Sequence, residues 1–215
     1  MTLQARVREV DDPIGMLVLI HGRGADENDL FPLFDILDPD GRLVGVCPRG
    51  PLELPPGGAH WYVVREVGYP GPETFFPTFE RASRWLDETV AQYGLGFDSV
   101  ILGGFSQGCV MTYALAFAAG RPAPAGVLAL SGFIPTVEGF ELDLTKETRV
   151  AIGHGTYDPI IEVGWGRDAH RRLSEAGADV TYTEYPLPHA IDPGYAQELQ
   201  VWIKTLLEER GPGPR

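Results

Sequence analysis

Gly104-Phe105-Ser106-Gln107-Gly108 determines the interpretation of this chain, because it joins a short apolar run to a helical pattern. Val100-Ile101-Leu102 precedes it, and residues 107–119 follow with the composition of a covered helix. A serine at such a strand–turn–helix junction is held in a strained backbone conformation, which costs roughly 1–3 kcal/mol and exposes its hydroxyl. The flanking glycines let strand and helix pass closely. An ordinary tight turn can carry the same five residues, but this context favours a nucleophile at Ser106.

The composition is that of a single globular domain that does not bind polyanions. The chain has 215 residues, of which 44% are hydrophobic and 22% charged, and its formal net charge is −13. That charge argues against nucleic acid and anionic membranes as partners. No apolar stretch reaches the roughly 18 residues of a membrane span. We expect one domain over residues 1–209 and a flexible tail over residues 210–215.

The two cysteines and the N-terminal residues predict a cytoplasmic protein. Cys47 and Cys109 have neither the spacing of a disulfide framework nor that of a metal site, so both are expected to be reduced. Residues 1–8 lack the apolar core of a secretory signal. The sequence does not determine the oligomeric state, and a homodimer is one possibility.

Seven short apolar runs alternate with helical patterns along the chain. Strands are expected over residues 4–10 (at an edge), 16–20, 43–47, 100–103, 127–130, 150–152 and 180–185. Helices are expected over residues 30–37, 79–93, 107–119 and 163–176, and near the C-terminus. This alternation predicts a mostly parallel sheet covered on both faces, with the active site at the carboxyl ends of its strands. Residues 48–77 are expected to form a long loop that acts as a cap or pocket wall.

A serine nucleophile needs a base, and the base needs a carboxylate that fixes its tautomer. His189 is the preferred base among the five histidines, because it lies in a loop just past a strand end. On its own, a loop histidine is more often a solvated or capping residue. Asp158 is the preferred acid, because it also follows a strand and Pro159 biases it toward an extended backbone. The remaining histidines are His21, His60, His154 and His170.

Two residues compete with this assignment. Asp192 lies only three residues from His189, but Asp192-Pro193 is typical of a helix N-cap followed by proline at the first helical position. Ser131 is a second serine after a strand, but no glycine precedes it as Gly104 precedes Ser106. A structural role is therefore expected for both competitors.

The negative oxygen of the tetrahedral intermediate needs backbone donors. The N–H of Gln107, at the positive end of the helix after the nucleophile, is one candidate. The second is the N–H of Arg23, because Gly22 and Gly24 let this loop fold close to the serine. Losing one such donor typically costs about 2.7–4 kcal/mol of barrier. The loop could instead be a plain turn or a phosphate cradle, although it is too short for a dinucleotide fingerprint and lacks the Walker lysine.

Together these motifs resemble the α/β-hydrolase superfamily, in particular its small carboxylesterase, phospholipase and acyl-protein thioesterase group. The matching segments are Ile20-His21-Gly22-Arg23-Gly24-Ala25-Asp26, Gly104-Phe105-Ser106-Gln107-Gly108, Leu130-Ser131-Gly132, His154-Gly155-Thr156-Tyr157-Asp158-Pro159 and Pro188-His189-Ala190-Ile191. The resemblance implies a three-layer α/β-hydrolase sandwich of about seven strands without a large lid. It implies a triad of Ser106, Asp158 and His189. It also implies oxyanion donors at Arg23 and Gln107, with no metal or organic cofactor.

Two positions depart from the group, which usually has leucine where Arg23 stands and glycine where Pro188 stands. Arg23 places a cation beside the oxyanion loop. It could form a salt bridge to Asp26 or Glu27, or it could recognise an acidic group on the acyl or alcohol portion of the substrate. The arginine also makes an acyl-protein thioesterase a less secure assignment.

The expected reaction is hydrolysis of a carboxylic ester in two steps. Ser106 attacks the carbonyl while His189 takes its proton, and water then releases the acyl group by the same route. Six residues are expected to line the pocket, although core packing would explain them almost as well: Trp61, Tyr62, Phe75, Phe76, Phe133 and Ile160. If they do line it, the acyl group is apolar and of small to moderate size.

The sequence is also compatible with other functions. An acyl thioesterase or a lysophospholipase would use the same machinery. A lactonase similar to dienelactone hydrolases would share the fold, but that group normally carries cysteine at the position of Ser106. A ligand-binding relative without catalysis would be favoured by the loss of a triad residue, and all three are present.

Overall fold

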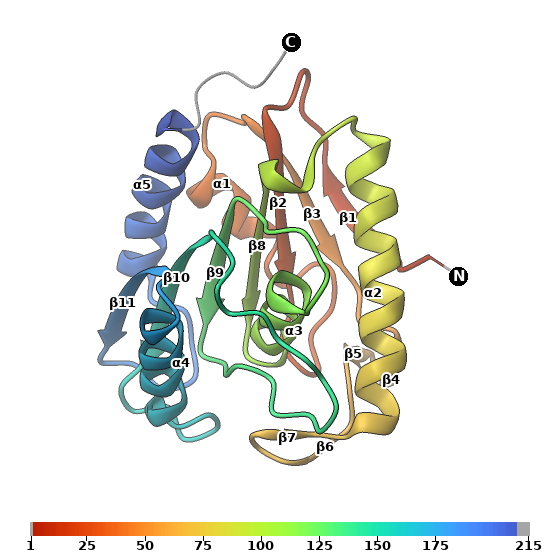
Figure 1. Cartoon of the computed structure of the whole chain (residues 1–215). Coiled ribbons are helices and arrows are strands. Elements are labelled where there is room, and N and C mark those ends of the chain that lie inside the picture. The colour runs from red at the N-terminus through yellow and green to blue at the C-terminus, as the bar shows by residue number, and fades with distance from the viewer. Residues whose placement is uncertain (1, 210–215) are drawn as a thin grey trace.

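A seven-stranded sheet in the order β1-β3-β2-β8-β9-β10-β11 forms the centre of the computed structural model, which describes residues 2–209 (Figure 1). Its strands are β1 (Ala5–Arg8), β2 (Gly15–Ile20), β3 (Leu43–Pro48), β8 (Val100–Phe105), β9 (Gly126–Leu130), β10 (Arg149–Gly155) and β11 (Asp179–Tyr185). Only β1 runs antiparallel, at one edge, and the other six strands are parallel. The predicted seven-stranded, mostly parallel sheet is confirmed. The tail predicted over residues 210–215 lies outside the described residues.

Helices cover both faces of the sheet. One face carries α2 (Pro72–Gln92), α3 (Gln107–Phe117) and α4 (Val163–Glu175), and the other carries α1 (Phe34–Leu37) and α5 (Pro193–Glu209) (Figure 1). Two 3-10 turns, η1 (Phe31–Leu33) and η2 (Phe97–Ser99), precede α1 and β8. The side chains of β2 divide between two hydrophobic clusters, with Met16, Val18 and Ile20 on the α3 side and Leu17 and Leu19 on the α5 side. The predicted three-layer sandwich is confirmed, and residues 2–209 contain no large lid.

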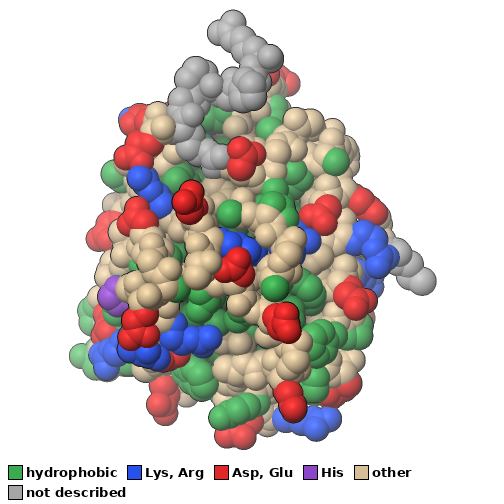
Figure 2. Space-filling model, viewed as in Figure 1, with side chains coloured by type: hydrophobic (Ala, Val, Ile, Leu, Met, Phe, Trp, Pro, Cys, Tyr) green, Lys and Arg blue, Asp and Glu red, His purple; other side chains and the backbone are tan. Residues whose placement is uncertain are grey.

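Burial on both faces explains why the inner strands of the sheet appear as continuous apolar runs. Every residue of β2 and of β3 is buried. All residues of α3 are buried as well, as its composition predicted. Acidic side chains are spread over the face of the molecule seen in Figure 2, in keeping with the net charge of −13. None of the described helices is both long and apolar enough to cross a membrane.

The prediction of a long loop over residues 48–77 is wrong in detail, because most of this segment has regular structure. It contains the hairpin of β4 (Leu52–Leu54) and β5 (Gly58–His60), and that of β6 (Val64–Glu66) and β7 (Tyr69–Pro70). Helix α2 already begins at Pro72, with Gly71 as its N-cap. Proline is favoured at the first helical position, because its missing N–H would have no partner there. Phe75 and Phe76 therefore belong to α2 and not to a loop.

Candidate active site

Ser106 lies at the apex of the turn between β8 and α3, with φ 57° and ψ −120°. A positive φ is unfavourable for a serine and stores strain at this position. Both glycines of the turn are required by close approaches. A Cβ on Gly104 would lie 2.5 Å from the carbonyl carbon of Gly108, and a Cβ on Gly108 would lie 2.0 Å from the carbonyl oxygen of Ile20. The turn thus packs α3 directly against β8 and the end of β2.

Ser106, His189 and Asp158 form a continuous chain of hydrogen bonds. The Nε2 of His189 lies 2.8 Å from the Ser106 Oγ, and its Nδ1 lies 2.6 Å from the Asp158 Oδ2. Because a carboxylate only accepts, Nδ1–H donates to Asp158, and the bare Nε2 accepts the serine proton. The ring of Phe105 packs against that of His189, with centroids 4.7 Å apart. The three residues thus meet in the arrangement of a catalytic triad.

The backbone of its own turn fixes the carboxylate of Asp158. Its Oδ1 accepts hydrogen bonds from the N–H groups of Ile160 and Ile161, each 2.9 Å away. These two donors leave Oδ2 to face His189. The side chain is fully buried, so its orientation is held without competition from water.

His154 is a second buried histidine beside this carboxylate, and its part in the site was not predicted. Its Nε2–H donates to the carbonyl oxygen of Ile161 at 2.8 Å and lies 3.6 Å from the Asp158 Oδ2. Burial lowers the pKa of His154, which keeps the ring neutral. Its Nδ1 is buried without a hydrogen-bond partner within residues 2–209, and Gly166 of α4 packs against it. His154 therefore holds the turn that carries Asp158.

The loop after β2 brings its backbone next to the nucleophile. A Cβ built on Gly22 would lie only 3.4 Å from the Cβ of Ser106. The N–H groups of Arg23 and Gln107 are not donors in any backbone hydrogen bond described between elements of residues 2–209. The loop is in turn held by β5, since the N–H of Gly24 donates to the Ala59 carbonyl at 2.8 Å.

His21 supports the same loop from inside the molecule. Its Nδ1–H donates to the Gly22 carbonyl at 2.7 Å, and its Nε2 accepts from the Gly50 N–H at 2.9 Å. The indole N–H of Trp61 donates to the His21 carbonyl at 2.9 Å. Burial lowers the pKa of His21, so the neutral ring that this pattern needs is also the favoured form.

The Gln107 side chain ties the hairpin segment to the nucleophile turn. Its Oε1 accepts from the Trp61 N–H at 2.8 Å, and its Nε2–H donates to the Tyr62 carbonyl at 2.7 Å. Both hydrogen bonds are buried. The residue whose N–H was predicted to bind the oxyanion is therefore also a structural link, which the sequence did not indicate.

The two competing residues have structural positions. The Asp192 Oδ1 accepts from the N–H of Tyr195 at 2.8 Å at the start of α5, as an N-cap does. Ser131 is fully buried with φ 47°, and its N–H donates to the Gly153 carbonyl at 2.9 Å. Neither contacts His189 in the described hydrogen bonds of the site.

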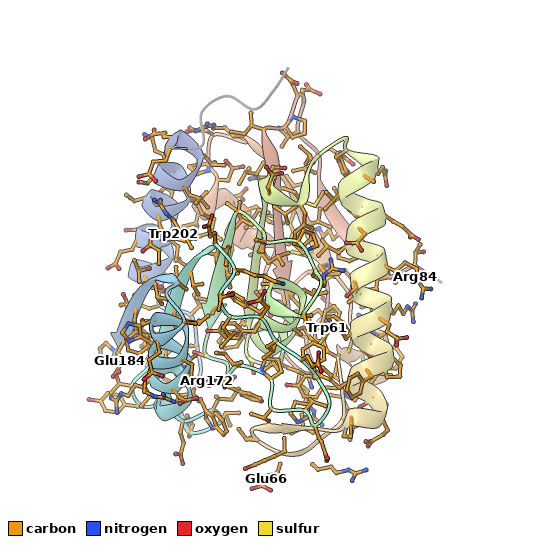
Figure 3. All side chains as sticks on the ribbon, viewed as in Figure 1. Trp61, Glu66, Arg84, Arg172, Glu184 and Trp202 are labelled. Atoms are coloured by element: carbon orange, nitrogen blue, oxygen red, sulfur yellow. The ribbon has the colours of Figure 1, made fainter. Side chains whose placement is uncertain are left out.

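Most of the expected pocket residues are buried in the core. Trp61, labelled inside the molecule in Figure 3, is fully buried, and so are Phe75 and Tyr62, at 0% and 2% exposed. Phe133 packs against Trp165, with ring centroids 5.1 Å apart, and Phe76 packs against Phe140. Phe76 is only half-buried. Ile160 is largely exposed, at 56%, and lies two residues from Asp158.

The two cysteines lie in the hydrophobic core. Cys47 and Cys109 are both free and buried, and burial raises the pKa of the Cys47 thiol to about 12. Within residues 2–209, no group of three or more His, Cys, Asp or Glu side chains is arranged to hold a metal ion.

Comparison with known proteins places this site in a family. The chain is 28% identical over 194 residues to acyl-protein thioesterase 1 of Debaryomyces hansenii, covering 79% of this chain and 81% of that protein. It is 29% identical over 196 residues to the esterase YpfH of Escherichia coli, covering 86% and 81%. The fold matches that of the Bacillus cereus carboxylesterase, with a TM-score of 0.83 at 23% identity over 95% of this chain and 94% of that one. It also matches esterase PE8, with a TM-score of 0.85 at 22% identity over 96% and 100%. Residues 4–207 match the phospholipase/carboxylesterase family, and with the Ser–His–Asp network at its strand ends the chain belongs to this family of α/β hydrolases.

Proposed function

We propose that this chain hydrolyses carboxylic esters of small to moderate acyl length through an acyl-enzyme on Ser106. The observation that carries the proposal is the hydrogen-bond chain from Ser106 through His189 to Asp158, at 2.8 Å and 2.6 Å. A strained serine, a base with the correct tautomer and a buried acid are what this chemistry needs.

In the first step, the Ser106 Oγ forms a bond to the ester carbonyl carbon while its proton passes to the Nε2 of His189. The imidazolium is stabilised by Asp158, and it gives the proton to the departing alcohol as the carbon–oxygen bond breaks. Water then attacks the acyl-enzyme by the same proton transfers, which frees the acid and restores Ser106. His189 thus acts as base and then as acid in each half-reaction.

The oxyanion of each tetrahedral intermediate would be bound by the N–H groups of Arg23 and Gln107. The short distance between Gly22 and the nucleophile supports this assignment, as do the hydrogen bonds that fix the loop through His21. Backbone donors held in place before the reaction cost no reorganisation when the charge develops.

The acyl group would lie against the apolar surface beside the triad. Ile160 supports this part of the proposal, because it is exposed next to the Asp158 turn. Phe133 and Phe76 could line the deeper wall. Trp61, Tyr62 and Phe75, being buried, would shape that wall from behind without touching the substrate.

Labelling with a fluorophosphonate tests the proposal directly. We expect the wild-type protein to be labelled at Ser106 and the Ser106→Ala variant not at all. Ser131→Ala is the matched control, because Ser131 also has a positive φ after a strand, and this variant should still be labelled. Labelling that persists in Ser106→Ala, or that disappears in a folded Ser131→Ala variant, would refute the assignment.

A panel of chromogenic esters and thioesters of graded length then separates ester from thioester hydrolysis. The relative named acyl-protein thioesterase 1 supports including thioesters. The free, buried cysteines support a location in the reducing cytoplasm, and light scattering of the purified protein distinguishes a monomer from a homodimer.

A further inference from the structure

Arg23 is an exposed cation in the loop that packs against the nucleophile. Within the part of the chain that the structure describes, its side chain takes part in no hydrogen bond, ion pair or ring contact. It follows Gly22, whose Cβ position lies 3.4 Å from the Cβ of Ser106. A side chain as long as arginine therefore starts within reach of a substrate held at Ser106.

The two carboxylates that could have neutralised Arg23 are bound to another arginine. Arg49 Nη1 lies 3.2 Å from the Glu27 Oε2 and 3.7 Å from the Asp26 Oδ2. The Asp26 Oδ1 also accepts from the backbone N–H of Asn28 at 2.8 Å. The prediction of a salt bridge from Arg23 to Asp26 or Glu27, one of the two roles that the sequence left open, is therefore wrong.

Arg23 is a local positive charge on a protein whose overall charge is negative. A net charge of −13 repels anionic ligands in general. A guanidinium, by contrast, presents a rigid fork of N–H donors that binds a carboxylate through two parallel hydrogen bonds. A carboxylate that belongs to the ester substrate would therefore find a local partner in Arg23 when the ester binds at Ser106.

We propose that Arg23 binds a free carboxylate on the ester substrate, so that the enzyme prefers esters carrying a second, ionised acid group. This inference rests on the proposed esterase function. The carboxylate belongs either to the acyl chain or to the alcohol, at a distance from the scissile carbonyl that the arginine side chain can span. Recognition by the side chain is separate from the oxyanion role of the Arg23 N–H.

Two isosteric substrate pairs test the inference and distinguish the two positions. The first pair is 3-carboxyphenyl acetate and 3-carbamoylphenyl acetate, with the charge on the alcohol. The second is the monoethyl ester of glutaric acid and the ethyl ester of glutaramic acid, with the charge on the acyl chain. For each pair, the ratio of kcat/KM for the acid to that for the amide is measured in the wild type, Arg23→Gln, Arg23→Lys and Arg84→Gln. Because the ratio is taken within one variant, any change in the oxyanion loop cancels.

Arg84 is the matched control, because it is also exposed and has no described partner, yet it projects from α2 away from the sheet (Figure 3). We expect Arg23→Gln to lower the acid-to-amide ratio about tenfold in one of the pairs, near the lower end for a charged hydrogen bond because the site is exposed. Arg23→Lys should lower it less, and Arg84→Gln should leave it unchanged.

An unchanged ratio for both pairs in Arg23→Gln would overturn the inference, and so would an equal fall in Arg84→Gln. Failure of the proposed function gives a different result. In that case the wild type would hydrolyse the ester bond of neither uncharged substrate, 3-carbamoylphenyl acetate or the ethyl ester of glutaramic acid. Alternatively, Ser106→Ala would hydrolyse these esters as fast as the wild type does.

Discussion

Replacing Asp158 by asparagine should remove most of the activity while leaving the fold intact. In the wild type, the N–H groups of Ile160 and Ile161 both donate to the Oδ1, each at 2.9 Å. An asparagine that turned its NH2 group toward these donors would lose both hydrogen bonds, at about 1–3 kcal/mol each for a buried group. The amide oxygen therefore takes the position of Oδ1, and the NH2 group faces His189.

This orientation gives His189 the wrong tautomer. The NH2 group can only donate to Nδ1, so the ring proton moves to Nε2, which can no longer accept the proton of Ser106. The wrong tautomer lowers kcat about 10⁴-fold in a triad of this type, which corresponds to roughly 5 kcal/mol of barrier at about 1.4 kcal/mol per tenfold change. The distances to Ser106 and Ile161 should hardly change.

The assay is the steady-state hydrolysis of 4-nitrophenyl butyrate, with circular dichroism melting to confirm folding. Asp192→Asn is the matched control, since Asp192 lies three residues from His189 and asparagine caps a helix as well as aspartate does. We expect its kcat within threefold of wild type, which corresponds to a barrier change of at most about 0.65 kcal/mol. A folded Asp158→Asn variant within tenfold of wild type, or a loss in Asp192→Asn as large as that in Asp158→Asn, would refute the reasoning.

Two further predictions concern stability. Gly108→Ala should lose at least about 2 kcal/mol of unfolding free energy in urea titrations, because its Cβ would lie 2.0 Å from the Ile20 carbonyl oxygen. In the control Gly164→Ala, the new Cβ has no atom within 4 Å, so this variant should be as stable as the wild type or more stable by up to roughly 1 kcal/mol. Equal losses in the two variants would contradict this prediction. Burial lowers the pKa of His21 and of His154 below the ordinary 6.5, so below pH 6.5 the unfolded chain binds protons that the folded chain does not. The free energy of unfolding should therefore be at its full value above pH 6.5. Below that pH it should fall by up to about 1.4 kcal/mol per pH unit for each histidine. Urea titrations between pH 7 and pH 5 measure this slope, which His154→Gln should reduce; an identical slope in that variant would contradict the prediction.

Much of the fold and the triad could be predicted because their signals are local. The inner parallel strands are buried on both faces, so β2 and β3 appear as uninterrupted apolar runs. The triad residues each follow a strand, and parallel strands bring their carboxyl ends to one edge. Ser106, Asp158 and His189 could therefore be chosen without knowing a single contact.

The remainder depends on contacts between distant residues. Strands β4 to β7 are two or three residues long, too short for any periodicity, and the pairing of Gly24 with Ala59 cannot be inferred from either segment. Nothing near His154 in the sequence indicates that its ring bonds to the turn of Asp158. Likewise, Asp26 and Glu27 lie closer in sequence to Arg23 but bind Arg49 in space.

The two hydrogen bonds of the Gln107 side chain bear on how this enzyme could be redesigned. They anchor the backbone at Trp61 and Tyr62, immediately before the β6–β7 hairpin with its exposed Val64 and Tyr69, so that a change confined to this hairpin begins beyond a fixed point. Grafting hairpins of other lengths or chemistry after residue 62 should alter which molecules enter while the catalytic machinery keeps its alignment. The anchor itself offers no such freedom, since any replacement of Gln107 would disturb both the wall and the nucleophile together.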